Sequence, residues 1–426
     1  MPAAAYRELL RVPSVLWLLT TSVIGRLNQG MTGLALLMLI TEHHSYAVAG
    51  LISTAGVAGG FLAGPLLSRW ADTYGRRRVL SITAVLNALT VTTIVLVPAG
   101  ALMLAALSFL SGLCTPPLTA AVRAALPALV GEKRRKTVFA LESTLQELIF
   151  VLGPPATVML AAFGGPRLAM ASCGVCVLAG TLGYVRDRNV DIGRRPGART
   201  QGGWVLRTRG VPRVIGAGAL LYGALACQSL GVIALVSGSR VATDAGFVVA
   251  GSLGSLVGGL VYGSLSRHRA QLRHLMLFVA IGLAALPLAS DRNILTVLVF
   301  CWGLTLAPAM SQLFERLSSL APPESATEAF GWMNSAVTAG NALGSALSGV
   351  LITVYGPRAP LVAACAAAAL AALICEPWPR FRTRALLPSE TGDSHAPDAL
   401  RSIDRPAGPA ERRPRRRRAP QPPPGP

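Results

Sequence analysis

The sequence contains few charged residues for its length. Only 14% of its 426 residues are Asp, Glu, Lys or Arg, and 52% are hydrophobic, whereas roughly a quarter of the residues of a soluble protein are charged. The mean hydropathy is +0.53. This composition excludes an ordinary soluble domain. Apolar runs of about 18 residues or more recur about a dozen times, and each is long enough to cross a bilayer as a helix.

Several functional signatures are absent. The sequence has no GxxxxGK[ST] phosphate-binding loop, which argues against an ATP-driven pump. Its seven cysteines lie within or at the ends of apolar runs, so they imply no disulfide framework. Cys173 and Cys176 form a CxxC without a nearby histidine, which favours helix packing over a metal or redox site. We therefore expect neither a metal site nor a cofactor. No small-residue cleavage site follows the first apolar run, Val12–Ile40, which indicates an uncleaved first span.

Acidic residues are scarcer than basic ones. There are 19 Asp and Glu against 39 Lys and Arg, which gives a formal net charge of +20. A basic chain can bind nucleic acid, but these cations fall in alternate loops and the intervening loops are short and nearly uncharged. This positive-inside pattern predicts a multi-pass cell-membrane protein with an even number of spans, both termini in the cytoplasm and no nucleic-acid partner.

A polar, basic stretch from Arg186 to Gly210 divides the apolar region into two halves that resemble one another. The segment from Phe139 aligns without gaps with the segment from Phe330, and the segment from Ser68 aligns with the segment from Gly263. The two offsets are similar, so the repeat is parallel, and a site is expected between the halves. The predicted organisation is an N-terminal six-helix bundle (1–185), a basic cytoplasmic linker (186–212), a C-terminal six-helix bundle (213–377) and a disordered, basic, Pro-rich cytoplasmic tail (378–426).

The loop after the second span, "SRWADTYGRRRVL", concentrates charge between two apolar runs. It resembles the signature of the major facilitator superfamily in the corresponding loop. The matching residues are Ala71, Asp72, Gly75, Arg76 and Arg77, whereas Ser68, Trp70 and Thr73 depart from the pattern. The resemblance covers roughly residues 10–378. It implies an all-α membrane protein with twelve transmembrane helices in two parallel-repeat six-helix bundles, working as a transporter.

The resemblance also implies a conformational latch. Asp72 is expected near the cytoplasmic N-terminus of the eleventh span, with Arg76 in a charge cluster that closes the inner gate. A carboxylate at a helix N-terminus is stabilising by about 0.3–1 kcal/mol, and this contact exists only while the halves are closed. The expected latch residues are Asp72, Gly75, Arg76, Arg77, Arg123 and Glu142. A simple topology signal would explain the arginines but not Asp72 or Gly75. The latch is expected to be one-sided, because Arg267 aligns with Asp72 in the second half.

Charged residues inside spans are the next candidates. Arg26 lies near the middle of the first span, and Gln29 follows it on the same helical face, so this face is expected to line a cavity. Glu142 and Arg123 lie at similar depth near the inner surface and are expected to form a structural pair. Glu147 lies roughly 15 Å into the fifth span, at the depth of Arg26. Our hypothesis is that Arg26 pairs with Glu147 and that Glu147 exchanges a proton or a substrate contact. A purely structural buried pair is the alternative.

The second half contributes polar residues in place of charges. Asn334, Thr338, Asn341 and Ser345 form a stripe along the eleventh span, and Tyr222 and Gln228 in the seventh are further candidates for a cavity wall. The alternative for all of them is hydrogen bonding between helices. Gly153 to Pro155 partly resembles the fifth-span signature of drug and proton antiporters and predicts a helix kink.

These observations together predict a secondary active transporter that moves a small organic molecule or drug out of the cell by proton antiport, through alternating access. Uptake of a small metabolite by proton symport is the alternative within transport. A membrane-embedded enzyme is disfavoured, because Arg26, Glu142 and Glu147 are a poor basis for a catalytic site. The expected partners are the small-molecule substrate, protons and the lipid bilayer, and the protein is expected to be monomeric.

Overall fold

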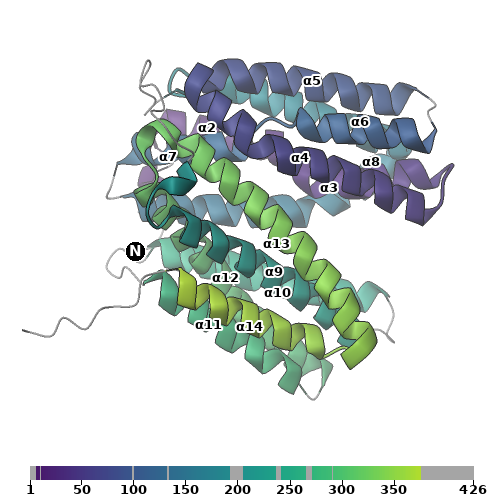
Figure 1. The fold of residues 1–426 in the computed structure, drawn as a ribbon, viewed down its shortest axis with the longest axis vertical. Coiled ribbons are helices and arrows are strands. Elements are labelled where there is room, and N and C mark those ends of the chain that lie inside the picture. Colours follow the sequence, from purple (N-terminus) through teal and green to yellow (C-terminus); the bar gives the residue numbers. More distant parts are fainter. Residues whose placement is uncertain are drawn as a thin grey trace, which may run out of the picture. The chain divides into compact units, whose positions relative to one another are not determined.

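Helices make up the regular structure of the computed structural model, which describes residues 6–9, 11–97, 100–131, 134–191, 205–236, 241–264, 271–289 and 291–375. No β-strand occurs within these ranges. The long helices (Figure 1) are α2 (Pro13–Arg26), α3 (Asn28–Thr41), α4 (Tyr46–Tyr74), α5 (Arg76–Leu96), α6 (Ala101–Leu113), α7 (Leu118–Val130), α8 (Arg135–Val185), α9 (Val211–Val236), α10 (Val241–Ser264), α11 (Leu272–Ala285), α12 (Arg292–Leu320), α13 (Ala326–Tyr355) and α14 (Ala359–Ile374).

The described helices are those of a membrane protein. Eight helical segments are long and apolar enough to cross a bilayer, and three shorter apolar helices accompany them. Large apolar side chains such as Leu102 (86%), Phe163 (77%) and Leu343 (72%) are exposed. An apolar surface of this kind is favourable in contact with lipid and unfavourable in contact with water. The prediction of an all-α membrane protein is confirmed.

The 51-residue helix α8 crosses the bundle twice. Gly153 in its first part lies against Gly30, and Gly180 in its last part lies against Gly25. Gly25 and Gly30 are close neighbours on one span, whereas a straight helix would separate Gly153 from Gly180 by about 40 Å. The chain therefore reverses between them, at Gly165, whose φ of 75° favours glycine. The two parts of α8 are therefore two crossings, which correspond to the fifth and sixth of the predicted spans.

The first and fourth spans each consist of two helices, and only the fourth is interrupted. The first span continues from Arg26, the last residue of α2, to Asn28, the first residue of α3, because Leu27 between them keeps helical φ and ψ of −57° and −30°. The fourth span breaks between Leu113 and Leu118, where two consecutive prolines lack the backbone N–H that a continuous helix needs. Interrupted membrane helices leave backbone polar groups free at mid-depth. The break in the fourth span lies at the site described below, whose cavity Thr115, Pro116 and Pro117 line.

Each half has its own apolar core. The first half contains two buried clusters, around Leu18 and around Met31. The second half contains a larger one around Leu313, which Ala120 and Phe139 of the first half join. All the described residues belong to one compact unit. The division of this region into two six-helix bundles therefore stays a prediction from the sequence repeat.

Parts of the predicted organisation fall outside the described residues. They include residues 192–204 of the linker predicted at 186–212, together with Arg267 and the tail predicted at 378–426.

Candidate functional site

A central cavity of about 1110 Å³ lies between the two halves of the described chain. Its walls come from α3, α4, α7 and α8 of the first half and from α9, α10, α12 and α13 of the second. Most lining residues are apolar or small. Figure 1 shows α4 and α13 approaching each other where α4 ends and diverging toward the opposite end of the helices. We call the end where α4 finishes the Asp72 end.

A buried charge network lies beside the cavity in the first half. Arg26 and Arg123 both contact Glu142, at 3.0 Å from the same carboxylate oxygen. The side chains of Arg26, Arg123 and Glu142 are 1%, 6% and 0% exposed. Their pairing offsets the free-energy cost of burying these charges away from water. Arg26 also donates to the Oε1 of Gln146, one turn further along α8. The network continues through Gln29, which accepts from Gln146 at 3.2 Å and donates to a threonine of α7 at 3.1 Å.

The predicted pairing of Arg26 with Glu147 is wrong. Arg26 binds Glu142 and Gln146, which are four residues apart and share one face of α8, whereas Glu147 is turned about 100° away from Gln146. The predicted pairing of Arg123 with Glu142 is present at 3.0 Å. However, Glu142 holds both arginines, and estimates of depth alone could not reveal this sharing.

Glu147 lines the central cavity. Among the described residues that line it, Glu147 is the only Asp, Glu, Lys, Arg or His. The structure records no ion pair between its carboxylate and a described residue. The two arginines of the network are buried and are not among the residues that line the cavity. Glu147 is therefore the charge most directly presented to a bound molecule.

The polar residues predicted in the second half also line the cavity. Tyr222 and Gln228 come from α9, and Asn334, Thr338 and Asn341 come from α13. Thr338 additionally donates to the backbone oxygen of Asn334 at 3.0 Å, which satisfies its hydroxyl within its own helix. The two asparagines and Gln228 offer amide groups to the cavity without a formal charge.

An aromatic cluster that sequence reasoning missed lies between the halves. Phe330 of α13 packs against Phe314 of α12, with ring centroids 6.5 Å apart, and against Phe139 of α8 at 6.2 Å. The guanidinium of Arg123 lies 3.7 Å from the centre of the Phe314 ring, a favourable cation–π contact. These rings come within one or two turns of cavity-lining residues on the same helices, so they close the cavity toward the Asp72 end. The sequence aligns the segments that begin at Phe139 and Phe330, but the alignment does not indicate that these rings meet.

Asp72 lies at the N-terminus of α13. Its carboxylate accepts a hydrogen bond of 2.8 Å from the backbone N–H of Glu328, in the first turn of that helix. Its other oxygen lies 3.7 Å from the guanidinium of Arg76. Arg76 in turn donates to the hydroxyl of Thr327 at 2.9 Å. The structure therefore places Asp72 and Arg76 across the junction of the halves, where the resemblance puts them.

Two further expected latch residues, Gly75 and Arg77, act within the first half. Gly75 has a φ of 105°, a conformation that favours glycine. It ends α4 and lets α5 begin at once with Arg76, whose backbone N–H donates to Asp191 at 2.8 Å. Arg77 donates to the backbone oxygen of Asp187 at 3.0 Å. Arg77 therefore anchors the loop to the end of α8 and makes no recorded contact across the halves.

The contact between α4 and α13 extends from Asp72 toward the cavity, and we call it the α4–α13 seam. Ser68 lies against Gly331, and Gly64 lies against Ser335. The hydroxyl of Ser335 donates to the backbone oxygen of Phe61 at 2.9 Å. The α4 residues recur every three or four positions, so one helical face makes the whole seam. Replacing Gly331 by a larger residue would force the helices apart at the Ser68 hydroxyl.

A second seam joins α8 to α10 across the halves. Thr137 donates to the backbone oxygen of Gly263 at 3.1 Å. The hydroxyl of Tyr6, in the short helix at residues 6–9, donates to backbone oxygens of the same helix at 3.1 and 3.2 Å. Burial raises the pKa of Tyr6 to about 12, so it remains a donor at neutral pH. Sequence reasoning missed this seam, because backbone acceptors leave no trace in the sequence.

Within the described residues, no group of three or more His, Cys, Asp or Glu has the geometry to hold a metal ion. The described cysteines are all free.

Comparison with known proteins gives the family. The Major Facilitator Superfamily matches residues 18–338, and matches again over residues 242–418. Because the first match covers most of the sequence, the chain belongs to this superfamily. It is a secondary transporter, not an enzyme.

Solved structures share the fold at low sequence identity. The human organic anion transporter MFSD10 (TETRAN) is 16% identical, with a TM-score of 0.66 over 85% of this chain and 100% of that chain. A bacterial homologue of the iron transporter ferroportin, in an outward-facing state, is 15% identical, with a TM-score of 0.68 over 84% and 98%. The proton:xylose symporter XylE is 13% identical, with a TM-score of 0.67 over 86% and 95%. No curated protein matches the sequence.

Proposed function

We propose that this transporter exports a small, largely apolar organic molecule in exchange for protons. The observation that carries the proposal is the central cavity, whose walls are mainly apolar and whose lining contains one carboxylate, Glu147. An apolar wall with a few placed polar groups is the usual form of a small-molecule site. The amides of Gln228, Asn334 and Asn341 then orient the substrate by hydrogen bonds.

Glu147 is the proposed proton-binding residue. A carboxylate that faces the cavity without a recorded ion pair can gain or lose a proton without breaking a structural contact. Its protonation changes the charge of the cavity by one. Arg26, Arg123 and Glu142 form a fixed network that retains one net positive charge, so an ionised Glu147 neutralises the site. Protonation of Glu147 therefore alters how strongly the cavity holds the polar end of the substrate, and this coupling is what exchange requires.

The Asp72 end is the proposed cytoplasmic side of the cell membrane. Described basic residues concentrate at this end of the helices, namely Arg76, Arg77, Arg78, Arg134, Arg135, Lys136, Arg186, Arg188, Arg207, Arg209, Arg213, Arg273 and Arg316. At the opposite ends of the described helices are Arg167, Arg292 and Arg358. This asymmetry supports a cytoplasmic location of the Asp72 end and of both termini.

The transporter then alternates between a conformation that is closed at the Asp72 end and one that is closed at the opposite end. In the conformation described here, the α4–α13 seam and the seam between α8 and α10 close the Asp72 end. Release of Asp72 from the N-terminus of α13 would let the halves rock open on the cytoplasmic side. The protein is proposed to work as a monomer, since each monomer has its own cavity.

The test uses purified protein in vesicles with an imposed pH gradient and an internal pH-sensitive dye. Addition of a transported compound is expected to dissipate the gradient in wild-type vesicles. Glu147→Gln is expected to abolish proton movement while the protein remains folded. The matched control is Glu42→Gln, which neutralises an exposed carboxylate at the end of α3.

Two results would contradict this proposal. Proton-coupled transport that persists in Glu147→Gln would end the coupling role of this residue. In cells, greater accumulation of every responsive compound when the protein is expressed would show uptake, and the symport alternative would replace export.

A further inference from the structure

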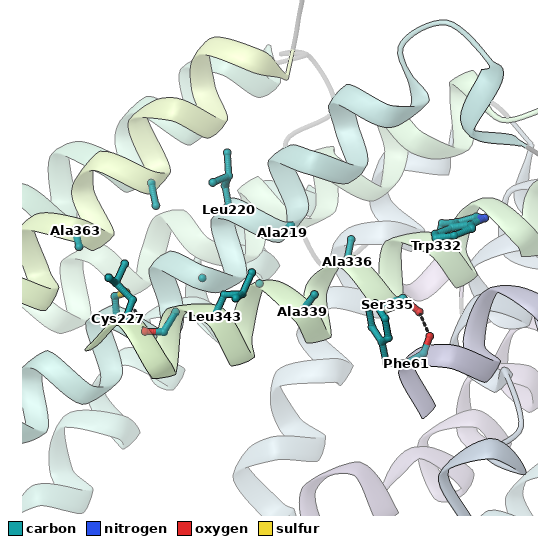
Figure 2. Close-up of a pocket in the computed structure, with 15 residues that line it drawn as sticks. Phe61, Ala219, Leu220, Cys227, Trp332, Ser335, Ala336, Ala339, Leu343 and Ala363 are labelled. Atoms are coloured by element: carbon teal, nitrogen blue, oxygen red, sulfur yellow. Dashed lines mark hydrogen bonds between the residues drawn. The ribbon is translucent and has the colours of Figure 1, made fainter. Parts of the chain in front are cut away.

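A second, smaller cavity lies on the outer side of α13. This outer pocket has a volume of about 460 Å³ and is lined by α9, α13 and α14, together with Phe61 of α4 (Figure 2). None of the described residues that line it is charged. Its serine, Ser335, already donates to the backbone oxygen of Phe61 at 2.9 Å. The outer pocket therefore suits apolar groups.

Helix α13 lies between the two cavities, and its opposite faces line them. Asn334, Thr338 and Asn341 line the central cavity, whereas Ala339 and Leu343 line the outer pocket. At about 100° per residue, the two sets point to opposite sides of the helix. The polar stripe that was expected from the sequence thus has an apolar counterpart behind it.

Phe61 lines both cavities. It is also the last recorded contact of the α4–α13 seam on the side away from Asp72. Beyond it, Val57 of α4 and Thr338 of α13 line the central cavity. The side chain of Phe61 is 40% exposed, so no packed neighbour holds it on every side. One movable ring therefore stands where the two cavities adjoin.

The outer pocket faces the hydrocarbon of the bilayer. Leu343 and Leu347, which line it, are 72% and 49% exposed, and α9, α13 and α14 belong to the membrane-spanning region. Exposed leucines on such a surface contact acyl chains. A molecule dissolved in the bilayer consequently meets the outer pocket without first passing through water.

We propose that the substrate is a lipid-soluble, uncharged compound with one hydrogen-bonding end, which enters the central cavity sideways from the bilayer through the outer pocket, with Phe61 as the gate. The inference rests on the proposed function and names its substrate class. The apolar body fits the outer pocket, and the polar end reaches the amides of Asn334 and Asn341 only after Phe61 has moved. A water-soluble compound has no reason to use this path.

Photolabelling tests the route without relying on proton coupling. The probe is a dodecanamide that carries a diazirine on its chain, incorporated into vesicles with the full-length protein. Wild-type protein is expected to be labelled both in the outer pocket, near Leu343, and in the central cavity, near Glu147. Ala339→Trp fills the outer pocket and should reduce both labels severalfold. The matched control, Val350→Trp, adds the same group to an exposed site on α13 outside the pocket and should leave both unchanged.

A second pair of variants tests the gate. Phe61→Ala should raise the rate of labelling near Glu147 severalfold, whereas Leu62→Ala, which changes the exposed neighbour that lines neither cavity, should not. Labelling near Glu147 that persists in Ala339→Trp, or is unchanged in Phe61→Ala, overturns the lateral route. So does a diazirine phospholipid that occupies the outer pocket and is not displaced by the probe, since the pocket would then hold resident lipid. The pH-gradient assay with Glu147→Gln reports separately on the proposed function.

Discussion

Removal of the Asp72 carboxylate should open the Asp72 end of the protein. In Asp72→Ala, the backbone N–H of Glu328 loses an acceptor at 2.8 Å and Arg76 loses a carboxylate at 3.7 Å. A hydrogen bond to a charged group contributes about 1.5–3 kcal/mol, and the helix dipole up to about 2 kcal/mol in partly buried geometry. The two contributions overlap, because the same N–H group produces part of the dipole.

We therefore expect Asp72→Ala to cost the closed conformation about 2–3 kcal/mol, which shifts the equilibrium between the two conformations by roughly 30-fold to 150-fold. Asp72→Asn retains an acceptor but loses the charge. It should shift the equilibrium by about 1 kcal/mol, or roughly fivefold. The geometry therefore predicts that the population of the open conformation rises in the order wild type, Asp72→Asn, Asp72→Ala.

Distances between spin labels measure the shift. Labels at Tyr74 of α4 and Ser319 of α12 are both exposed at the Asp72 end and lie in different halves. They should show a longer second distance whose population rises from wild type to Asp72→Asn to Asp72→Ala. The native cysteines are replaced beforehand so that only the chosen sites react.

Asp187→Ala is the matched control, because this carboxylate lies at the same end but accepts its recorded hydrogen bond from Asn189 of its own half. It should leave the distance distribution as in wild type. Identical distributions for Asp72→Ala and wild type would refute the latch, as would an equal shift in the control.

Three further variants test other parts of the structure by thermal unfolding in detergent. Glu142→Gln is expected to lower the free energy of unfolding by about 3–5 kcal/mol, because two buried arginines lose their charged partner. Unfolding as in wild type would show that the network is dispensable. Gly340→Ala would press a methyl group into the backbone of α9 and should lower the unfolding temperature, whereas Gly349→Ala has nothing within 4 Å and should not; equal effects would contradict the packing of α9 on α13. Tyr6 has a pKa raised from 10.0 to about 12, so its stabilising contribution is complete below about pH 10 and is lost as the pH rises through about 12. Tyr6→Phe should therefore be less stable than wild type near neutral pH and equal to it at the upper limit, and a difference that does not change with pH would argue against the hydroxyl as the cause.

The sequence was sufficient for features that are local or periodic. Hydropathy and the basic loops indicate the membrane region. The charged loop motif predicts that Asp72 lies at the N-terminus of the eleventh span, because the motif consists of a few adjacent residues whose arrangement is local. The stripe of Asn334, Thr338 and Asn341 follows from helical periodicity, and the structure places it on the cavity.

Features that depend on helix rotation and packing could not be predicted in the same way. The partner of Arg26 is Glu142 and not Glu147, because the choice depends on which face of α8 turns toward the first span. The outer pocket arises from packing among four helices, and no short sequence segment encodes it.

Glu147, the one described Asp, Glu, Lys or Arg that lines the central cavity, and the buried network of Arg26, Arg123 and Glu142 both belong to the first half, whereas the second half lines the cavity with neutral groups. Substitutions on α9 or α13 can therefore alter which molecules fit without changing the charge balance that proposed proton exchange depends on. Within one transporter, substrate range and energy coupling are then free to evolve separately. A change in the compounds handled needs only neutral replacements in the second half, while the first half stays constant.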